Sequence, residues 1–246
     1  MKFSAVAFDL DGTLYPNFEL YSRLVPFLMK EQRLLRALDK ARRQLRKSGA
    51  YEEDFYDTQG RLMAEILYEP VKDVMERTER LIYRGWEPLF KKIRLFPHVK
   101  ETLDTFRKEG IKLGILSDFP PEIKLQNLQI DSYWDVVVCS EKTGKLKPHP
   151  ASFLDLAGGI GEKPEDILYV GNSISYDVEG AQNAGMKAAL IQSRWKKLPV
   201  ISGIMPLGLS ELSGPFAFGS SKRARQNHKP DFTFFDYRQL RDYVLS

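Results

Sequence analysis

A short apolar run near the start of the sequence is followed at once by acidic residues. Residues 3–10 read F-S-A-V-A-F-D-L, which has the length and composition of a buried β-strand. Asp11, Gly12 and Thr13 interrupt this run. Because glycine reaches backbone angles that are closed to other residues, Gly12 predicts a tight turn or loop here. Two carboxylates, Asp9 and Asp11, therefore stand at the carboxyl end of the first predicted strand.

The next 80 residues, from 16 to 95, have the hydrophobic spacing of helices. Their large apolar residues recur three, four or seven positions apart, as on one face of a helix: Leu24, Phe27, Leu28, Leu34, Leu35, Leu38 and Leu45. A break is expected at Ser48-Gly49. Two further helices are predicted over 53–67 and 71–83, with Pro70 between them.

Beyond Pro97 the pattern changes to short apolar runs that alternate with amphipathic ones. Strands are predicted at 111–116, 136–139, 167–170, 187–191 and 232–235. Helices are predicted at 99–108, 121–128, 150–157, 178–184 and 237–245. Such alternation is typical of an α/β fold, with a parallel sheet and helices on both of its faces.

Two segments do not follow this alternation and suggest the domain organisation. Residues 16–95 form a helical insert after the first strand, so that 1–15 and 96–246 make up the α/β core. Residues 195–230 are rich in Gly, Ser, Pro, Lys and Arg and read as an extra loop insertion. The basic residues of that loop are interpreted as a charged surface rather than a site for nucleic acid or acidic partners: Lys222, Arg223 and Arg225.

Composition and charge narrow the class of protein. The 246 residues carry a net charge of +4, which favours a small anionic substrate but is too weak to indicate nucleic acid. The single cysteine, Cys139, excludes an intrachain disulfide and fits a reducing cytosol. The apolar N-terminus meets Asp9 too soon for a signal peptide, and no run approaches the ~20 residues of a membrane helix. We therefore expect a cytoplasmic protein with no membrane partner.

The carboxylate pair at the first strand end is the first candidate for chemistry. In a parallel α/β sheet, ligands bind beyond the carboxyl ends of the strands. One aspartate there can attack phosphorus, and the other can protonate the leaving oxygen and later deprotonate water. By itself, the pair fits equally well with two carboxylates that cap the following turn.

Three later segments bring further polar groups to strand ends. Ser117 and Asp118 follow the second strand; a hydroxyl and backbone N–H groups there can hold phosphate oxygens. Lys147, in G-K-L-K-P-H-P, can place a positive charge near a phosphate. Asn172 and Asp177 follow the fourth strand and offer oxygen ligands of the kind that Mg²⁺ prefers. Taken singly, these residues also read as a helix cap, a surface lysine and a helix N-terminal carboxylate.

Together, these segments resemble the motifs of the haloacid dehalogenase superfamily. F-D-L-D-G-T-L resembles its first motif, I-L-S-D its second, G-K-L-K-P-H-P its third and V-G-N-S-I-S-Y-D its fourth. The resemblance extends over residues 2–191. It implies a Rossmann-like core with a mainly α-helical cap domain inserted after the first strand, formed here by 16–95.

The resemblance also implies a role for each matching residue. Asp9 is the nucleophile and a magnesium ligand, and Asp11 is the general acid/base whose backbone carbonyl also touches the metal. Ser117 and the backbone N–H of Asp118 hold the phosphoryl group. Lys147 neutralises charge, and the remaining metal ligands are Asn172 and Asp177. The implied enzyme is a Mg²⁺-dependent phosphatase that acts on a small phosphorylated metabolite through an aspartyl phosphate.

Two positions depart from the usual pattern of this family. Asn172 stands where phosphatases have an aspartate, which keeps an oxygen ligand but removes one negative charge. Asp118 stands where asparagine is common. Asp11 is retained, which favours phosphate esters over haloacids or phosphonates. Two alternatives stay open: a phosphomutase like β-phosphoglucomutase, and a non-catalytic binding or regulatory protein on this scaffold.

The helical insert and His228 offer weaker candidates. The insert has a basic run that we interpret chiefly as a solvated helix face: Arg33, Arg36, Arg42, Arg43, Arg46 and Lys47. Its rings Phe18, Tyr21 and Tyr51 are assigned to core packing rather than to a substrate pocket. His228 has no second histidine or cysteine nearby and receives no metal role.

Overall fold

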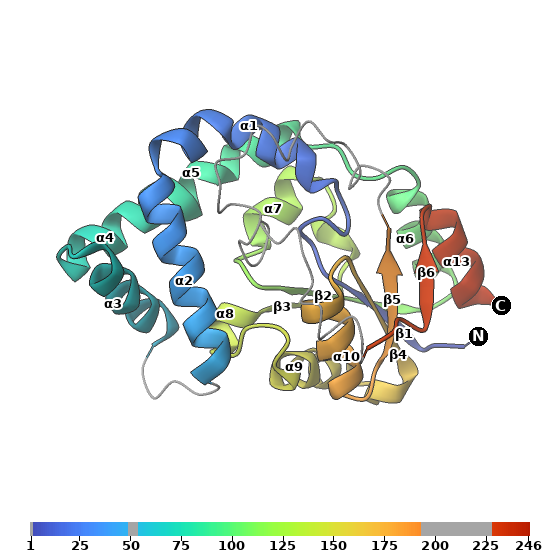
Figure 1. The fold of residues 1–246 in the computed structure, drawn as a ribbon. Coiled ribbons are helices and arrows are strands. Elements are labelled where there is room, and N and C mark those ends of the chain that lie inside the picture. Colours follow the sequence, from blue (N-terminus) through green and yellow to red (C-terminus); the bar gives the residue numbers. More distant parts are fainter. Residues whose placement is uncertain (1, 49–53, 193–227) are drawn as a thin grey trace.

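A six-stranded, fully parallel sheet forms the centre of the structure (Figure 1). The computed structural model describes residues 2–48, 54–192 and 228–246. The strands are β1 (Ala5–Phe8), β2 (Lys112–Ser117), β3 (Val136–Cys139), β4 (Ile167–Gly171), β5 (Lys187–Ile191) and β6 (Phe232–Phe234). Their spatial order is β3-β2-β1-β4-β5-β6. The chain leaves β1 toward β2 and leaves β4 toward β5, so the crevice between β1 and β4 is the switch point at which α/β sheets bind ligands.

Helices cover both faces of this sheet. One face is covered by α6 (Val99–Lys108) and α13 (Tyr237–Leu245), and the other by α9 (Pro150–Ile160) and α10 (Glu179–Asn183). Side chains alternate along β1: Val6 and Phe8 pack into the first cluster, whereas Ala5 and Ala7 pack into the second. Both faces are buried, which explains why the strands read as continuous apolar runs.

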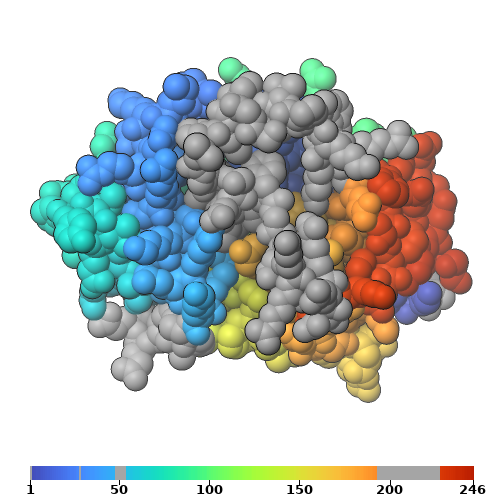
Figure 2. Space-filling model, in the orientation of Figure 1, coloured from blue at the N-terminus to red at the C-terminus, as the bar shows by residue number. Residues whose placement is uncertain are grey.

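The segment between β1 and α6 is helical. It comprises α1 (Asn17–Lys30), α2 (Gln32–Ser48), α3 (Phe55–Leu67), α4 (Val71–Thr78), the π-turn η1 (Glu79–Tyr83), α5 (Arg84–Trp86) and the 3₁₀ turn η2 (Glu87–Lys92). In Figure 2 this segment, blue to cyan, occupies one side of the molecule, and the C-terminal β6 and α13, in red, occupy the opposite side. Helix α3 contacts the short α8 (Ser140–Thr143), which follows β3.

The predicted fold class is confirmed, and several element bounds agree to the residue. Helices 99–108 and 237–245 and strands 136–139 and 187–191 are found as predicted. The remaining core elements are α7 (Glu122–Asn127), η3 (Asp131–Tyr133) and η4 (Pro164–Asp166).

The helix predicted from residue 178 starts four residues earlier, as the π-turn η5 (Ile174–Val178). Its backbone N–H groups at Asp177 and Val178 both donate to the carbonyl of Ser173, at 3.0 and 3.1 Å. This widened turn lets the Asp177 side chain face back toward the end of β4.

Part of the predicted 195–230 insertion, including Lys222, Arg223 and Arg225, lies outside the described residues, as does Tyr51. His228 is described, and its Nδ1 lies 3.2 Å from Oε1 of Gln182. None of the described helices is long and apolar enough to cross a membrane. Cys139 is buried at the end of β3, in agreement with its predicted packing role.

Candidate active site

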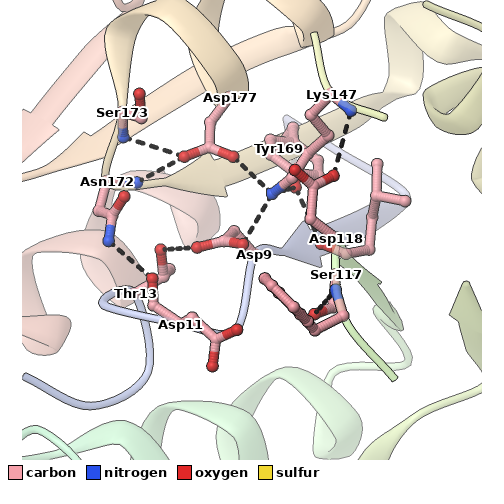
Figure 3. Close-up of polar contacts among 12 residues, drawn as sticks. Asp9, Asp11, Thr13, Ser117, Asp118, Lys147, Tyr169, Asn172, Ser173 and Asp177 are labelled. Carbon is pink, nitrogen blue, oxygen red and sulfur yellow. Dashed lines mark hydrogen bonds and ion pairs between the residues drawn. The ribbon is translucent and has the colours of Figure 1, made fainter. Parts of the chain in front are cut away.

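The predicted site residues converge at the carboxyl end of the sheet (Figure 3). Asp9 follows β1, Ser117 ends β2, and Asn172 and Asp177 follow β4, while Lys147 reaches in from the loop after α8. The side chains gathered here are buried, with the exception of the half-buried Asn172. Residues up to 168 positions apart in the sequence, from Asp9 to Asp177, thus share one site because parallel strands end at the same edge.

Lys147 joins the two innermost carboxylates. Its Nζ lies 2.7 Å from Oδ1 of Asp9 and 2.8 Å from Oδ1 of Asp177. Burial opposes the charged form of this lysine, but Asp177 and Asp9 outweigh it and raise the pKa of Lys147 well above its ordinary value. The lysine is therefore a fixed positive charge in the site.

Burial also disturbs the ionisation of Asp9. Burial raises its pKa from 3.8 to about 7, against the opposing effect of Lys147 and with a further rise from Asp177. The hydroxyl of Thr13 donates to Oδ2 of Asp9 at 2.7 Å, so each oxygen of Asp9 has a partner. Thr13, in the sequence D-G-T, thus orients Asp9, a role that was not predicted from the sequence.

Asp177 is held by the backbone at the end of β4. Its Oδ2 accepts hydrogen bonds from the backbone N–H groups of Asn172 and Ser173, at 3.0 and 2.9 Å. Gly171 makes this possible, since a Cβ at that position would lie 2.2 Å from the Cβ of Asp177. The side chain of Asn172 in turn donates from Nδ2 to the backbone carbonyl of Asp11 at 2.9 Å.

These groups form a donor set suited to a hard cation. Carboxylate oxygens of Asp9 and Asp177, the backbone carbonyl of Asp11 and the side-chain amide of Asn172 lie at this end of the sheet, and oxygen is the ligand that Mg²⁺ prefers. In this structure the amide presents its Nδ2 to the Asp11 carbonyl. Two carboxylates share one lysine here, and a divalent cation would balance the charge that the lysine leaves when both are ionised. Within the described ranges, however, no three acidic, histidine or cysteine side chains cluster on a common point. The amide and the carbonyl thus have to complete such a set.

The carboxylate of Asp11 has two partners that could not be expected from the sequence. Nζ of Lys124, on α7, lies 2.9 and 2.7 Å from its two carboxylate oxygens. The hydroxyl of the buried Tyr15 also donates to Oδ1. The carboxylate of Asp11 points away from Asp9 and Lys147, toward a different side of the site (Figure 3).

Ser117 and Asp118 lie beside Lys147 at the end of β2. The Oγ of Ser117 accepts from the backbone N–H of Phe119 at 3.3 Å, which is a turn contact. Asp118 accepts from the backbone N–H of Lys147 at 3.1 Å and from Arg46 at 2.6 Å. Burial raises the pKa of Asp118, but Arg46 and Lys147 outweigh it and hold the pKa below its usual value. The Asp118 side chain thus links the end of β2 to the loop that carries Lys147 and to Arg46 of α2.

The interpretation of the basic run on α2 as a solvated face is wrong for two of its members. Arg42 is only 1% exposed, and the side chain of Arg46 is 8% exposed. Arg46 also donates from Nε to the backbone carbonyl of Lys147 at 2.8 Å, and Arg42 donates to that of Asp118 at 2.9 Å. Arg42 lies four residues after Leu38 and three before Leu45, on the buried stripe of α2. This spacing could have predicted from the sequence that Arg42 is buried.

Arg42 makes a buried ion pair with Glu141 of α8. The hydroxyl of Tyr83, in η1, donates to the same Glu141 oxygen at 3.0 Å. Burial raises the pKa of Glu141, although Arg42 opposes this. The helical segment 17–92 is therefore attached to the sheet end by hydrogen-bonded charges.

Several cavities border the helical segment. One, about 710 Å³, lies among α3, α4 and η1, away from Asp9. Another, about 420 Å³, lies between this segment and the sheet end, and Lys124 and Phe119 form part of its wall. The rest of that wall combines aromatic and apolar side chains, including Tyr83, Trp86 and Phe90, with charged ones: Glu79, Arg84, Glu87, Glu122 and Lys142. Tyr21 is buried in the core, as predicted, whereas Phe18 is 38% exposed.

Comparison with known proteins agrees with this geometry. The haloacid dehalogenase-like hydrolase family matches residues 3–185, and the chain belongs to that family. It is therefore a hydrolase, as predicted. It is 29% identical over 195 residues to a glyceraldehyde 3-phosphate phosphatase of Methanothermobacter thermautotrophicus, covering 77% of this chain and 85% of the relative.

Two further similarities are also to phosphatases. A phosphoglycolate phosphatase of Haemophilus influenzae is 29% identical over 189 residues, covering 75% of this chain and 83% of the relative. The crystal structure of a HAD phosphatase from Thermococcus onnurineus superposes with a TM-score of 0.58 at 25% identity, covering 99% of this chain and 98% of that one. These relatives support the predicted phosphoric monoester hydrolase.

Proposed function

We propose that this chain is a Mg²⁺-dependent phosphatase that hydrolyses a small organic phosphate monoester through an aspartyl phosphate on Asp9. One observation carries the proposal: a buried lysine, Lys147, joins Asp9 to Asp177 at the switch point of the sheet. An attacking carboxylate needs a neighbouring positive charge when it approaches an anionic phosphate. Lys147 supplies that charge within 2.7 Å of the attacking oxygen.

The reaction has two displacements at phosphorus. In the first, an oxygen of Asp9 bonds to phosphorus, the ester P–O bond breaks, and the leaving oxygen takes a proton from Asp11. In the second, Asp11 takes a proton from water, the water oxygen bonds to phosphorus, and the bond to Asp9 breaks to release phosphate. Ser117 and the backbone N–H of Asp118 hold the phosphoryl oxygens, and Lys147 balances their charge.

Mg²⁺ would be held by Asp9, Asp177, the amide oxygen of Asn172 and the backbone carbonyl of Asp11. When bound, it would neutralise charge on the phosphoryl group and on Asp9. The amide of Asn172 leaves this set one negative charge short of the family's usual set. We therefore expect Asp9 and Asp177 to carry more of the cation's binding energy.

Residues 16–95 are proposed to act as a cap, over a core made of 1–15 and 96–246. The 420 Å³ cavity between them would then hold the organic part of the substrate, since Lys124 in its wall contacts Asp11. The relatives act on glyceraldehyde 3-phosphate and phosphoglycolate, which are small phosphorylated metabolites of this size class. A cytoplasmic location remains a prediction from the sequence.

Phosphate release from p-nitrophenyl phosphate and from a panel of metabolite phosphates, with and without Mg²⁺, tests the proposal. Asp9→Asn is expected to abolish release while keeping the circular dichroism spectrum of the wild type. Asp155→Asn, an exposed aspartate on α9, is the matched control and is expected to keep full activity. Turnover by Asp9→Asn at the wild-type rate would sink the assignment. Phosphate release only in the presence of a sugar bisphosphate would favour the phosphomutase. No phosphate release from any substrate would favour the binding protein.

A further inference from the structure

Helix α2 reaches the strand-end site through two arginines that lie one turn apart. Arg42 donates to the backbone carbonyl of Asp118 at 2.9 Å, and Arg46 donates from Nε to the backbone carbonyl of Lys147 at 2.8 Å. Residues four positions apart lie on one face of a helix. One face of α2 therefore holds the backbone of both segments that we assign to binding the phosphoryl group.

Arg46 also forms a buried ion pair with Asp118. Its Nη2 lies 2.6 Å from Oδ2 of Asp118, and the two side chains are 8% and 7% exposed. The other carboxylate oxygen of Asp118 accepts from the backbone N–H of Lys147 at 3.1 Å. The backbone of Lys147 is thus held at its N–H by Asp118 and at its carbonyl by Arg46, and these two side chains hold each other.

The guanidinium of Arg46 also lies against the segment that follows β4. Its central carbon is 4.8 Å from the ring centre of Tyr176, within the range of cation–π attraction. Tyr176 directly precedes Asp177 in η5. Arg46 therefore contacts three separate segments of the chain, and the residues Asp118, Lys147 and Asp177 of these segments meet at the site (Figure 3).

The backbone of Lys147 decides where its ammonium lies. Nζ is 2.7 Å from Asp9 and 2.8 Å from Asp177, so a small displacement of the lysine would lengthen both contacts. A displacement of about 1 Å in an active site can lower the rate by about 10²-fold. Loss of Arg46 would remove the donor to the Lys147 carbonyl and would leave the buried carboxylate of Asp118 without its arginine.

We propose that Arg46 is a positioning residue for the phosphate-binding site: together with Asp118 it fixes the backbone of Lys147, and so the ammonium that balances the phosphoryl charge. This inference rests on the proposed phosphatase function. Arg46 acts through Asp118 and Lys147 and not on the leaving group, so its loss should slow the first displacement to the same extent for different esters. Helix α2 is then a part of the phosphate site.

The test measures kcat/KM for p-nitrophenyl phosphate and phenyl phosphate, and the dissociation constant of inorganic phosphate in the presence of Mg²⁺. Both are measured at a temperature at which circular dichroism shows that each variant is folded. Arg46→Met is expected to lower the two kcat/KM values equally, by about 10–100-fold, and to weaken phosphate binding about tenfold. The matched control, Arg43→Met, removes a 41% exposed arginine of the same helix and should change none of these values. A folded Arg46→Met with wild-type values would overturn the proposal.

Asp118 supplies a rescue that a merely structural arginine would not predict. An asparagine at this position keeps an oxygen for the backbone N–H of Lys147 but carries no charge, so Asp118→Asn alone leaves Arg46 unpaired and should also lower kcat/KM. The double variant Arg46→Met/Asp118→Asn removes both buried charges and keeps that hydrogen bond. Its kcat/KM is expected to lie about tenfold above that of Arg46→Met. Losses that multiply in the double variant would contradict the role of Asp118.

Arg46→Lys covers the case in which Arg46→Met fails to fold. A lysine keeps the charge beside Asp118 but lacks the planar fork that donates to Asp118 and to the Lys147 carbonyl together, so the melting temperature should return while phosphate binding stays weaker than in the wild type. If the wild type hydrolyses both esters and the folded Arg46 variants match it, the positioning role is wrong and the phosphatase stands. If the wild type binds phosphate but hydrolyses no ester, the phosphatase fails, and phosphate binding by the variants still decides the positioning role.

Discussion

The buried pair of Arg42 and Glu141 offers a test of how the helical segment is attached to the sheet. The two side chains are 1% and 0% exposed and carry opposite full charges. Arg42 also donates to the carbonyl of Asp118 at 2.9 Å and stacks on Phe119, with 4.0 Å from its guanidinium carbon to the ring centre. We consider Arg42→Met, Glu141→Met and the double variant.

Either single substitution leaves a buried charge without its partner. Removing one member of a buried ion pair typically costs about 3–5 kcal/mol, whereas replacing both by apolar groups is often close to neutral. Each single variant should thus lose about 3–5 kcal/mol of unfolding free energy. The double variant should lose clearly less than the sum, with a coupling energy of about 2–3 kcal/mol.

Thermal unfolding followed by circular dichroism measures these losses. For a protein of this size, 1 kcal/mol shifts the midpoint by about 2–4 °C, so each single variant should melt roughly 6–20 °C lower. Because burial raises the pKa of Glu141, the loss in Arg42→Met should shrink at acid pH, where the unpaired acid is neutral. Arg43→Met, one position along and 41% exposed, is the control and should shift the midpoint little. Additive losses in the double variant would refute the reasoning.

Two further outcomes concern the strand-end loops. The pKa of Asp9 is raised from 3.8 to about 7, so ionising this carboxyl lowers the stability of the folded chain as pH rises through that range. Without Mg²⁺, Asp9→Asn should therefore have a higher melting temperature than the wild type at pH 8 and the same one near pH 4. A lower melting temperature at pH 8 would contradict this. Gly12 has φ +86° and a Cβ there would lie 2.0 Å from Nδ2 of Asn172, so Gly12→Ala should cost about 2–4 kcal/mol in urea unfolding. Gly110→Ala, at φ +73° with no atom within 4 Å, should cost about 1–2 kcal/mol; equal costs would show that the contact with Asn172 is unimportant.

The sequence was sufficient to predict the groups at strand ends. Asp9, Ser117 and Asn172 each follow a short apolar run, and parallel strands bring such positions together whatever the details of packing. Lys147 comes from a loop and Asp177 from the π-turn η5, and their positions followed from resemblance to the family's motifs. For the same reason the sheet and its helices were predicted well, since buried strands and amphipathic helices leave clear periodic patterns.

The pairings that reach across elements could not be predicted in this way. Lys124 of α7 meets Asp11 of the turn after β1 only in the folded chain, and E-I-K-L-Q-N carries no pattern that marks this lysine. Arg42 and Arg46 looked like a solvated face because charge was considered without helical phase. Their partners, Glu141 and Asp118, lie 99 and 72 residues away.

The central claim, a covalent intermediate on Asp9, is tested most directly by stalling the reaction after its first step. Asp11→Asn should still transfer the phosphoryl group from p-nitrophenyl phosphate, whose leaving group needs little protonation, but should hydrolyse the intermediate slowly. The expected result is a burst of about one equivalent of p-nitrophenolate per enzyme, with acid-quenched peptide mapping that places the phosphoryl group on Asp9. Steady release without a burst, and with no phosphoryl group on Asp9, would contradict the account.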